Sequence, residues 1–393
     1  MERIYRIVEI LFWTALFLTF YTYLGYGILL YLMVRIKELF IKKEKLHFPE
    51  TWPEVTLFIA AYNEEAIVAE KMANCRALSY PEGKLKIVWI TDGSTDHTNE
   101  RLKAYPEVTV LFRPKRMGKT AALNRGVPYV QTPYVVFTDA NTMLNPEAIR
   151  EIVRLFSDPK VGCVAGEKRV EIKTEQGATA GEGIYWKYES ALKNLDYRLY
   201  SAVGAAGELF AIRTDLFEEM PNDTLLDDFI LSLRIAQKGY KIAYSKDAYA
   251  IETASLNMKE EEKRKIRIAG GGLQSVWRLR SLLNIFRYGM LSFQYISHRV
   301  LRWTLTPLML FLLLPLNIIL AASGNLFYLI LLGMQLAFYL MGYFGHRLEQ
   351  KQMRNKLFFI PYYFLFMNIN VIRGARYLSR QKGSGAWEKA KRG

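Results

Sequence analysis

Three acidic sites lie in the polar middle of a 393-residue chain, and hydrophobic runs long enough to cross a membrane flank that middle on both sides. The sites are Asp92, Asp139 and the pair Asp227-Asp228. Because Asp92 and Asp139 end runs of β-branched and aromatic residues, we expect them at the carboxyl ends of buried strands. In an open α/β sheet, nucleotides bind at that edge. The arrangement indicates an enzyme that uses an activated donor at a membrane.

The hydrophobic runs predict several membrane segments. Ile7–Val34 is long enough to cross the hydrocarbon core of about 30 Å with some tilt. Val300–Ala322 and Leu326–Phe344 are predicted to form a hairpin of two further spans. Leu357–Ile372 is a weaker candidate because it is short and contains a proline, and Leu282–Tyr295 is expected to lie in the interface.

Charge sets the expected orientation. Basic residues follow the first span from Arg35 to Lys45 and the hairpin from Arg347 to Lys356, whereas its turn, Ser323–Asn325, is uncharged. The excess of positive charge on the cytosolic side therefore places the polar middle in the cytosol. The net charge of +15 suits anionic lipid headgroups better than nucleic acid, since no basic segment resembles a nucleic-acid-reading element. Cys75 and Cys163 lack metal-ligand spacing, which fits a reduced compartment.

Strand and helix patterns alternate between residues 55 and 166, which predicts an α/β domain with a largely parallel sheet. The expected strands are Val55–Ala61, Ile87–Thr91, Val108–Phe112 and Tyr134–Thr138, and the expected helices are Glu65–Leu78, His97–Ala104 and Thr120–Val127. Gly166–Tyr200 has no clear pattern. Further along, Gly204–Arg213 is a turn followed by an apolar run, and Thr224–Gln237 has the acidic start of a helix.

These patterns divide the chain into four parts. Residues 1–45 are expected to form a transmembrane helix and a basic linker, and residues 46–281 a cytosolic domain. Residues 282–298 would form the interfacial helix, and residues 299–393 the C-terminal transmembrane helices with a basic tail.

Each candidate motif also has a purely structural interpretation. Asp92-Gly93-Ser94 alone is an ordinary turn, and Asp227-Asp228 alone is an ordinary helix start. Gly118-Lys119-Thr120 mimics the end of a phosphate-binding P-loop, but Arg113 stands where that loop needs glycine. Gly270–Gly272 is either a hinge or a site of close helix packing, and we interpret the four scattered histidines as structural or solvated.

The combination is more informative than any single motif. One carboxylate could accept a hydrogen bond from a base or ribose, and a second could meet a diphosphate through a divalent cation. A third could take a proton from an attacking hydroxyl. The cations from Arg113 to Lys119 precede a predicted helix N-terminus, which suits a pyrophosphate.

The chain from about Leu24 onward resembles the membrane-embedded family 2 glycosyltransferases, the inverting group that includes the synthases of cellulose, hyaluronan and poly-β-1,6-N-acetylglucosamine. The resemblance depends on five segments taken together: Ala60–Glu65, Asp92–Ser94, Gly118–Asn124, Asp139–Asn141 and Leu226–Asp228. It implies a GT-A-type, Rossmann-like nucleotide-sugar domain inserted between transmembrane helices of a bacterial-type inner membrane, with the domain in the cytosol.

The resemblance also assigns expected roles. It implies that the donor, most simply a UDP-sugar, is bound by Ala60, Tyr62, Glu64, Asp92, Lys119, Asp139 and Asn141. Asp92 would contact the uracil and Lys119 the diphosphate. Asp228 would be the catalytic base, with Asp227 beside it. The acceptor and diphosphate side would comprise Gly207, Glu208, Arg264 and Arg267, and Mg²⁺ or Mn²⁺ would bind at Asp139 and Asn141.

Two departures from the family pattern qualify these roles. Asn141 replaces the second acid of the Asp-x-Asp motif, so one expected metal ligand is neutral. The Gln-x-x-Arg-Trp segment appears as Arg264-Lys265-Ile266-Arg267-Ile268, which retains only the arginine. The missing tryptophan weakens the prediction of a processive synthase.

Two other functions stay open at the level of sequence. One is a transporter or channel with a regulatory nucleotide-binding domain, although the predicted spans contain few of the ionisable groups that mark transport pathways. The other is a non-catalytic nucleotide-binding scaffold, against which the Asp227-Asp228 pair argues. The sequence favours transfer to a saccharide or lipid-linked acceptor, and it names neither the sugar nor any partner subunit.

Overall fold

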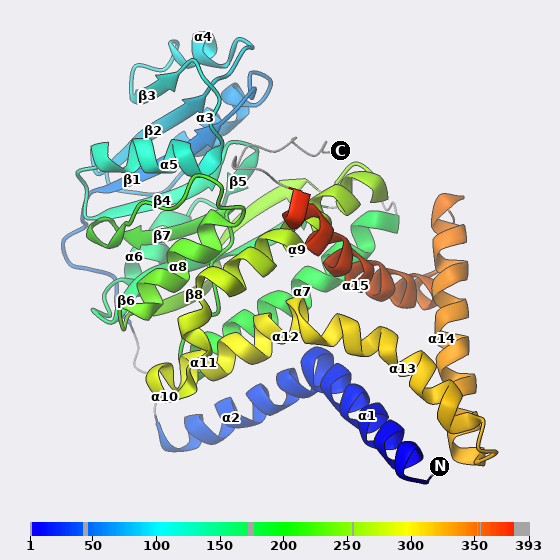
Figure 1. Ribbon diagram of the computed structural model, residues 1–393. Helices are drawn as coiled ribbons and strands as arrows, with labels where there is room; N and C mark the ends of the chain where they lie inside the picture. Colours follow the sequence, from blue (N-terminus) through cyan, green and yellow to red (C-terminus); the bar gives the residue numbers. More distant parts are fainter. Residues whose placement is uncertain are drawn as a thin grey trace.

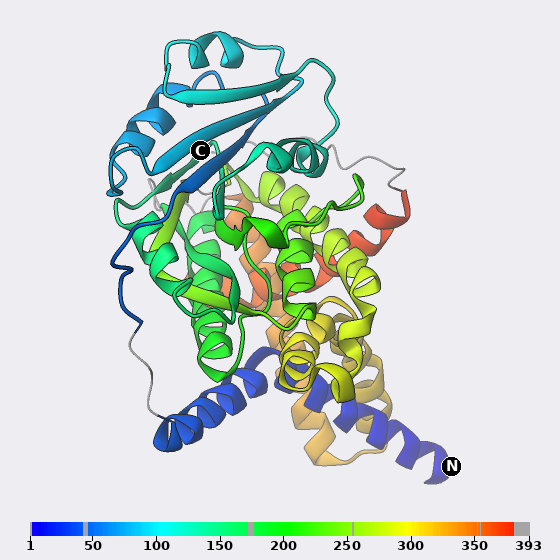
Figure 2. The ribbon, with the colours of Figure 1, turned by 90° about the vertical axis from the view of Figure 1, so that its left-hand side faces the viewer.

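The computed structural model describes residues 2–41, 46–171, 177–253, 255–351, 353 and 355–380, without the side chains of residues 177–185 and 356. An α/β domain lies at one end of the molecule, and the helices α1 (Glu2–Phe20), α13 (Leu305–Ala321) and α14 (Leu326–Gln350) lie at the other (Figures 1 and 2). The predicted basic segment at residues 42–45 and the tail at 381–393 lie outside the described residues.

An eight-stranded sheet forms the centre of the domain, in the order β3-β2-β1-β4-β7-β6-β8-β5. The four strands expected from sequence are present: β1 (Val55–Ala61), β2 (Leu85–Asp92), β3 (Val108–Arg113) and β4 (Tyr134–Asp139). They pair in parallel, so that their carboxyl ends meet at one edge. Asp92 and Asp139 are therefore the last residues of β2 and β4, as the alternating pattern predicted.

The stretch Gly166–Tyr200, which has no clear sequence pattern, belongs to the second half of the domain. That stretch forms the end of β6 (Val161–Glu171) and α7 (Gly177–Leu199). β7 (Leu209–Arg213) runs antiparallel to both β4 and β6, and β5 (Thr142–Leu144) runs antiparallel to β8 (Lys241–Thr253). The sheet is thus mixed rather than uniformly parallel, because two short strands reverse its direction.

Helices cover both faces of the sheet. On one face, α3 (Val68–Arg76), α4 (Thr98–Leu102) and α6 (Ala148–Leu155) share a core cluster with Leu57 and Ile59. On the other face, α5 (Lys119–Gly126) and α8 (Asp227–Gln237) share a core cluster with Phe58. Alternate residues of β1 point to opposite faces, and both sets are buried, which is the pattern of a central strand.

The first hydrophobic run has two different halves. α1 and α2 (Tyr26–Phe40) join through a π-helical turn at Tyr21–Gly25, where the helix bends (Figure 1). α2 buries Tyr26, Leu30 and Val34 against α7 of the α/β domain. The helix Glu2–Phe40 is apolar and long enough to cross a membrane, as predicted for Ile7–Val34, but it bends and its second half packs on the α/β domain.

The chain returns to the hydrophobic end through α9 (Met258–Arg278). The predicted interfacial helix Leu282–Tyr295 is divided into short pieces: η4 (Arg280–Leu283), α10 (Ile285–Tyr288) and α11 (Met290–Tyr295), followed by η5 (Ile296–Val300) and α12 (Leu301–Trp303). The predicted span Val300–Ala322 is likewise interrupted, since the helices Met290–Trp303 and Leu305–Ala321 meet at 52°.

The weakest predicted segment is a full helix, α15 (Lys356–Arg380), which packs on α14 and then on α9. Gly374 of α15 lies against Ala269 and Gly270, so the glycine run of α9 serves close helix packing rather than a hinge. Among the described residues, three helices are long and apolar enough to cross a membrane, and the bent pair would make a fourth.

Candidate active site

One large cavity of about 1140 Å³ lies between the carboxyl edge of the sheet and the helices at the hydrophobic end. Every residue that the sequence assigned to the site lines it: Ala60, Tyr62, Glu64, Asp92, Lys119, Asp139, Asn141, Gly207, Glu208, Asp227, Asp228, Arg264 and Arg267. The structure therefore brings together residues separated by some two hundred positions. Their individual roles stay predictions.

Asp92 fixes the loop that enters α5. Its carboxylate accepts hydrogen bonds from the backbone N–H of Met117 at 2.9 Å and of Gly118 at 2.7 Å. Gly93 follows in a left-handed conformation with φ of 71°, and a Cβ there would approach the Arg116 nitrogen to 2.5 Å. Only glycine fits that contact. Carboxylate oxygens have further lone pairs, so Asp92 can still accept from a ligand.

The segment after β1 is tied both to the turn that follows Asp92 and to the loop that enters α5. Asn63 adopts a left-handed conformation with φ of 52°, which asparagine tolerates better than most residues. Its side-chain oxygen accepts from the Thr95 N–H at 2.8 Å. Next to it, the Arg116 guanidinium lies 3.8 Å from the centre of the Tyr62 ring, a cation–π contact on the cavity wall. The segment after β1, the turn after β2 and the loop that enters α5 therefore form one platform.

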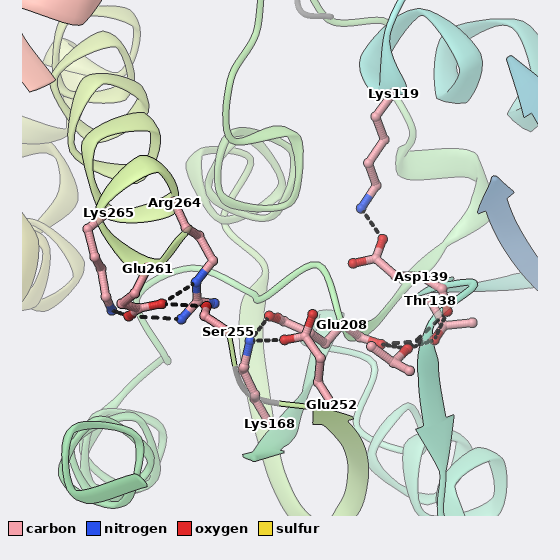
Figure 3. Close-up of polar contacts among 11 residues, drawn as sticks. Lys119, Thr138, Asp139, Lys168, Glu208, Glu252, Ser255, Glu261, Arg264 and Lys265 are labelled. Atoms are coloured by element: carbon pink, nitrogen blue, oxygen red, sulfur yellow. Dashed lines mark hydrogen bonds and ion pairs between the residues drawn. The ribbon is translucent and has the colours of Figure 1, made fainter. Parts of the chain in front are cut away.

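A cation and a carboxylate meet at the centre of the site. Lys119 Nζ, at the start of α5, lies 2.6 Å from Oδ1 of Asp139 (Figure 3). Burial alone would lower the pKa of the Lys119 ammonium, but the charges of Asp139, Asp227 and Asp228 outweigh this and raise it. Lys119 therefore stays protonated and is available to an anionic ligand.

The residues near Asp139 suit a cation that is held jointly with a ligand. Asp139 and Asn141 offer carboxylate and amide oxygens, the donors that hard divalent cations prefer. No group of three or more His, Cys, Asp or Glu side chains among the described residues forms a ready-made metal site. Mg²⁺ commonly binds one or two carboxylates and completes its shell with substrate phosphates. The donor set fits that arrangement.

Asp227 and Asp228 begin α8, where negative charge is favourable. The Phe229 N–H donates to Asp228 Oδ1 at 2.8 Å. Burial and the charge of Asp227 raise the pKa of Asp228 to about 7, although Lys119 opposes the shift. Oδ2 of Asp227 is buried without a hydrogen bond among the described residues. A carboxylate with a pKa of about 7 suits proton acceptance from a hydroxyl near neutral pH.

Gly207 keeps the space beside this pair open. A Cβ at Gly207 would lie 3.2 Å from Lys119 Nζ and 3.5 Å from Asp228 Oδ2. Gly204, three residues earlier, has φ of 84°, and its Cβ would lie 2.2 Å from the Phe229 ring. Glycine at both positions lets the loop pass directly over the start of α8.

Glu208 is held by a buried charge cluster that the sequence did not predict. Lys168 of β6 donates to both Glu208 and Glu252 of β8 (Figure 3). Burial alone would raise the pKa of Glu208, but the Lys168 charge and hydrogen bond lower it. Thr138 donates to the Glu208 carbonyl at 2.9 Å, which joins this cluster to β4.

Arg264 and Arg267 reach the cavity from α9. Arg264 is buried and donates to Glu261 at 3.0 Å, and Ser255 donates to the same carboxylate at 2.8 Å (Figure 3). Burial lowers the pKa of Arg267, and the nearby Arg264 charge adds to the effect, whereas Asp227 and Asp228 oppose it. The two arginines therefore place positive charge opposite the α8 carboxylates.

Sequence reasoning missed the polar face of α7. Glu189, Lys193 and Asp196 lie at i, i+4 and i+7, which is one face of a helix, and all three are buried. Asp196 Oδ2 lies 2.6 Å from His298 Nδ1, and Glu189 contacts Arg299 and Arg302. This spacing was visible in the sequence, but it lay in the stretch without a clear pattern.

Comparison with known proteins places the domain. Residues 53–271 match the family model "Glycosyltransferase like family 2". The chain is 27% identical over 236 residues to the poly-beta-1,6-N-acetyl-D-glucosamine synthase of Staphylococcus aureus. This match covers 57% of this chain and 56% of the relative. It is 31% identical over 199 residues to the beta-monoglucosyldiacylglycerol synthase of a Nostoc species, covering 47% of this chain and 41% of the relative.

The chain spans about half the length of the curated relatives it matches. Among solved structures, a mannosyltransferase from Pyrobaculum calidifontis, PcManGT, in complex with GDP-Man and Mn²⁺ superposes with a TM-score of 0.72. It is 22% identical and covers 95% of this chain and 99% of its own. The likeness extends through the helices at the hydrophobic end and confirms the predicted GT-A-type fold.

Proposed function

The chain belongs to the family 2 glycosyltransferases, and we propose that it moves a sugar, with inversion, from a nucleotide-sugar donor to a saccharide or lipid-linked acceptor at a membrane. The observation that supports this most directly is the position of Asp228. It shares one cavity with the Lys119–Asp139 pair, so a proton acceptor stands beside a site suited to a diphosphate. Family membership also makes an enzyme, rather than a transporter or scaffold, the appropriate conclusion.

The proposed reaction is a single displacement. Asp228 takes the proton from the acceptor hydroxyl as its oxygen bonds to the anomeric carbon, and the bond from that carbon to the donor phosphate breaks. The electron pair leaves with the nucleoside diphosphate. General-base assistance of this kind typically contributes about 10²–10⁴-fold in rate. Attack from the side opposite the leaving group inverts the configuration of the sugar.

Charge on the departing diphosphate needs stabilisation. Lys119 supplies a fixed positive charge next to Asp139, and Arg267 adds a second from α9. A divalent cation held by Asp139 and Asn141 together with the diphosphate would supply further electrostatic stabilisation when bound. PcManGT, whose fold this chain shares, forms a complex with GDP-Man and Mn²⁺, which supports this proposal.

The nucleoside would lie over the platform that contains Tyr62 and Arg116. Tyr62 with Arg116 offers a flat, positively charged surface on which a base can stack. Asp92 lies at the inner edge of the same platform and accepts hydrogen bonds, as contact with the N–H of uracil requires. We therefore favour a UDP-sugar donor.

We also propose that the enzyme is a multi-pass protein of the bacterial-type inner membrane with its active site in the cytosol, taking part in cell-surface polysaccharide synthesis. The apolar helices and the basic segments that follow them support this. We expect no nucleic-acid partner.

A panel of radiolabelled nucleotide sugars tests the proposal. Purified protein in detergent should consume one donor, release its nucleoside diphosphate and transfer the label to an acceptor, and an Asp228→Asn variant should not. If no nucleotide sugar binds or is consumed, the proposed function is wrong.

A further inference from the structure

The cavity extends beyond the reaction site into a space between helices of the hydrophobic end. This part, here called the aromatic chamber, is lined by Phe20 and Tyr23 before α2, Phe338 of α14, and Phe359, Tyr363 and Phe364 of α15. It is continuous with the wall that contains Asp228. A molecule whose hydroxyl reaches Asp228 therefore has direct access to an apolar space.

Polar side chains in and beside the chamber wall, those of Tyr23, Asn368 and Tyr363, are already bonded to the protein. Tyr23 donates to the Asn368 side chain, which in turn donates to the Phe364 carbonyl at 2.9 Å. Tyr363 donates to Glu261 at 3.2 Å. A saccharide chain would bury hydroxyls here without matching partners, which costs free energy. An acyl or isoprenoid chain has no such requirement, and its burial removes apolar surface from water, which is favourable.

A buried ammonium lines the same cavity as the chamber and the reaction site. Lys193 of α7 lines the cavity with 4% of its surface exposed, and it has no hydrogen bond or ion pair among the described residues. Its neighbour Arg299, by contrast, is paired with Glu189. A buried charge without a partner is unfavourable, so an anionic group of a ligand would be stabilised here.

The surroundings of Lys193 differ from those of Lys119. Burial and the Arg299 charge lower the pKa of Lys193, whereas Glu189, Glu208 and Asp228 oppose the shift. The charges that act on Lys119 come from Asp139, Asp227 and Asp228. Asp228 is the group common to both. Lys119 thus belongs to the proposed diphosphate site, whereas Lys193 belongs to α7 and is influenced by Arg299 of η5.

From the chamber and Lys193 together, and resting on the proposed function, we propose that the acceptor is an anionic lipid: its chains occupy the aromatic chamber, its phosphate contacts Lys193, and a hydroxyl of its headgroup faces Asp228. The transfer step is unchanged. The headgroup oxygen bonds to the anomeric carbon, its proton passes to Asp228, and the bond to the donor diphosphate breaks with its electron pair.

Three acceptors in detergent micelles, supplied with the donor that the panel identifies, test this. Phosphatidylglycerol offers chains, a phosphate and free hydroxyls; diacylglycerol offers chains and a hydroxyl without the phosphate; a soluble oligosaccharide offers hydroxyls alone. We expect label in the organic phase with phosphatidylglycerol, and at least about tenfold lower kcat/KM with diacylglycerol, since a hydrogen bond to a charged group is worth about 1.5–3 kcal/mol.

Matched variants locate the two contacts. Lys193→Met should raise the KM for phosphatidylglycerol at least about tenfold and leave the donor Kd unchanged, whereas Lys193→Arg should restore most activity. Lys187→Met, an exposed position on the same helix, is the control. Met367→Trp, which fills the chamber from α15, should reduce transfer to either lipid, and Leu357→Trp, at an exposed position of α15, should not.

Several outcomes would overturn the inference while leaving the proposed function intact. Transfer only to the oligosaccharide, or consumption of the donor without transfer to any lipid, would exclude a lipid acceptor. Equal use of diacylglycerol and phosphatidylglycerol, or equal effects of Lys193→Met on both, would exclude the phosphate contact. Absence of donor binding and consumption would instead refute the proposed function itself.

Discussion

Lys119 Nζ lies 2.6 Å from Oδ1 of Asp139, although the two residues belong to a helix start and a strand end that are twenty positions apart. The pair occupies a cavity with two further carboxylates at the start of α8. A cation so placed balances the protein's own acids in the absence of a ligand and can turn to a diphosphate when the donor binds.

Replacing Lys119 with methionine should weaken the binding of the nucleotide-sugar donor. The change removes the cation and leaves Asp139, Asp227 and Asp228 to repel the diphosphate, so we expect about 10-fold or greater loss of nucleotide-sugar affinity. Isothermal titration calorimetry measures this directly. Lys103→Met, at an exposed position remote from the cavity, serves as the control, and equal affinities in the two variants would contradict the assigned role.

Asn141→Asp should create a stronger cation site in the absence of donor. The natural chain offers one carboxylate and one amide there, so the cation should bind tightly only with the diphosphate present. Titration of Mn²⁺ followed by electron paramagnetic resonance should show tighter apo binding by the variant. Asn222→Asp adds the same charge at an exposed position outside the cavity and should change nothing. Full activity of the natural enzyme in excess chelator would refute the metal requirement.

Asp228→Asn tests the proposed base. The substitution preserves size and most hydrogen bonding but removes the proton acceptor, so sugar transfer should fall by about 10²-fold or more while donor binding survives. Radiolabel transfer and calorimetric binding should be measured on the same preparation. If the variant retains transfer within a few-fold of the natural enzyme, Asp227 becomes the candidate base.

The rate should depend on pH in a defined direction. Because the pKa of Asp228 is raised to about 7, the carboxyl group binds its proton below that pH and cannot accept one from the acceptor. We expect kcat/KM to rise through about pH 7 and to level off above it, since kcat/KM follows the ionisation of the free enzyme. A limb that rises only near the ordinary aspartate pKa of about 4 would contradict the assignment.

Cysteine labelling should establish the membrane orientation. In a background without Cys75 and Cys163, which are both buried, Ser323→Cys in the α13–α14 turn should react with an impermeant thiol reagent on intact cells. Lys351→Cys and Lys103→Cys should react only after the membrane is opened, because the positive-inside rule places them in the cytosol. The reverse pattern would contradict the orientation. A cysteine at position 384 would show whether α15 crosses fully.

Local sequence patterns determined much of this protein. The limits of β1 were predicted to the residue, and Asp92 and Asp139 were correctly placed at strand ends, because period-two hydrophobicity and turn residues act over a few neighbouring positions. The same locality explains why hydrophobic segments could be identified but the bend at Thr304 could not: hydropathy measures an average along the chain and not its direction.

Tertiary structure alone decided the rest. Lys168 meets Glu208 and Glu252 only because β6 lies between β7 and β8, and no local pattern specifies that order. Likewise, Tyr26, Asp196 and His298 form one buried hydrogen-bonded cluster from three distant segments. The order of residues determines which side chains are available and where strands end. Packing between elements far apart in the chain determines burial and charge pairing. The same packing forms the cavity that joins Asp228 to the aromatic chamber.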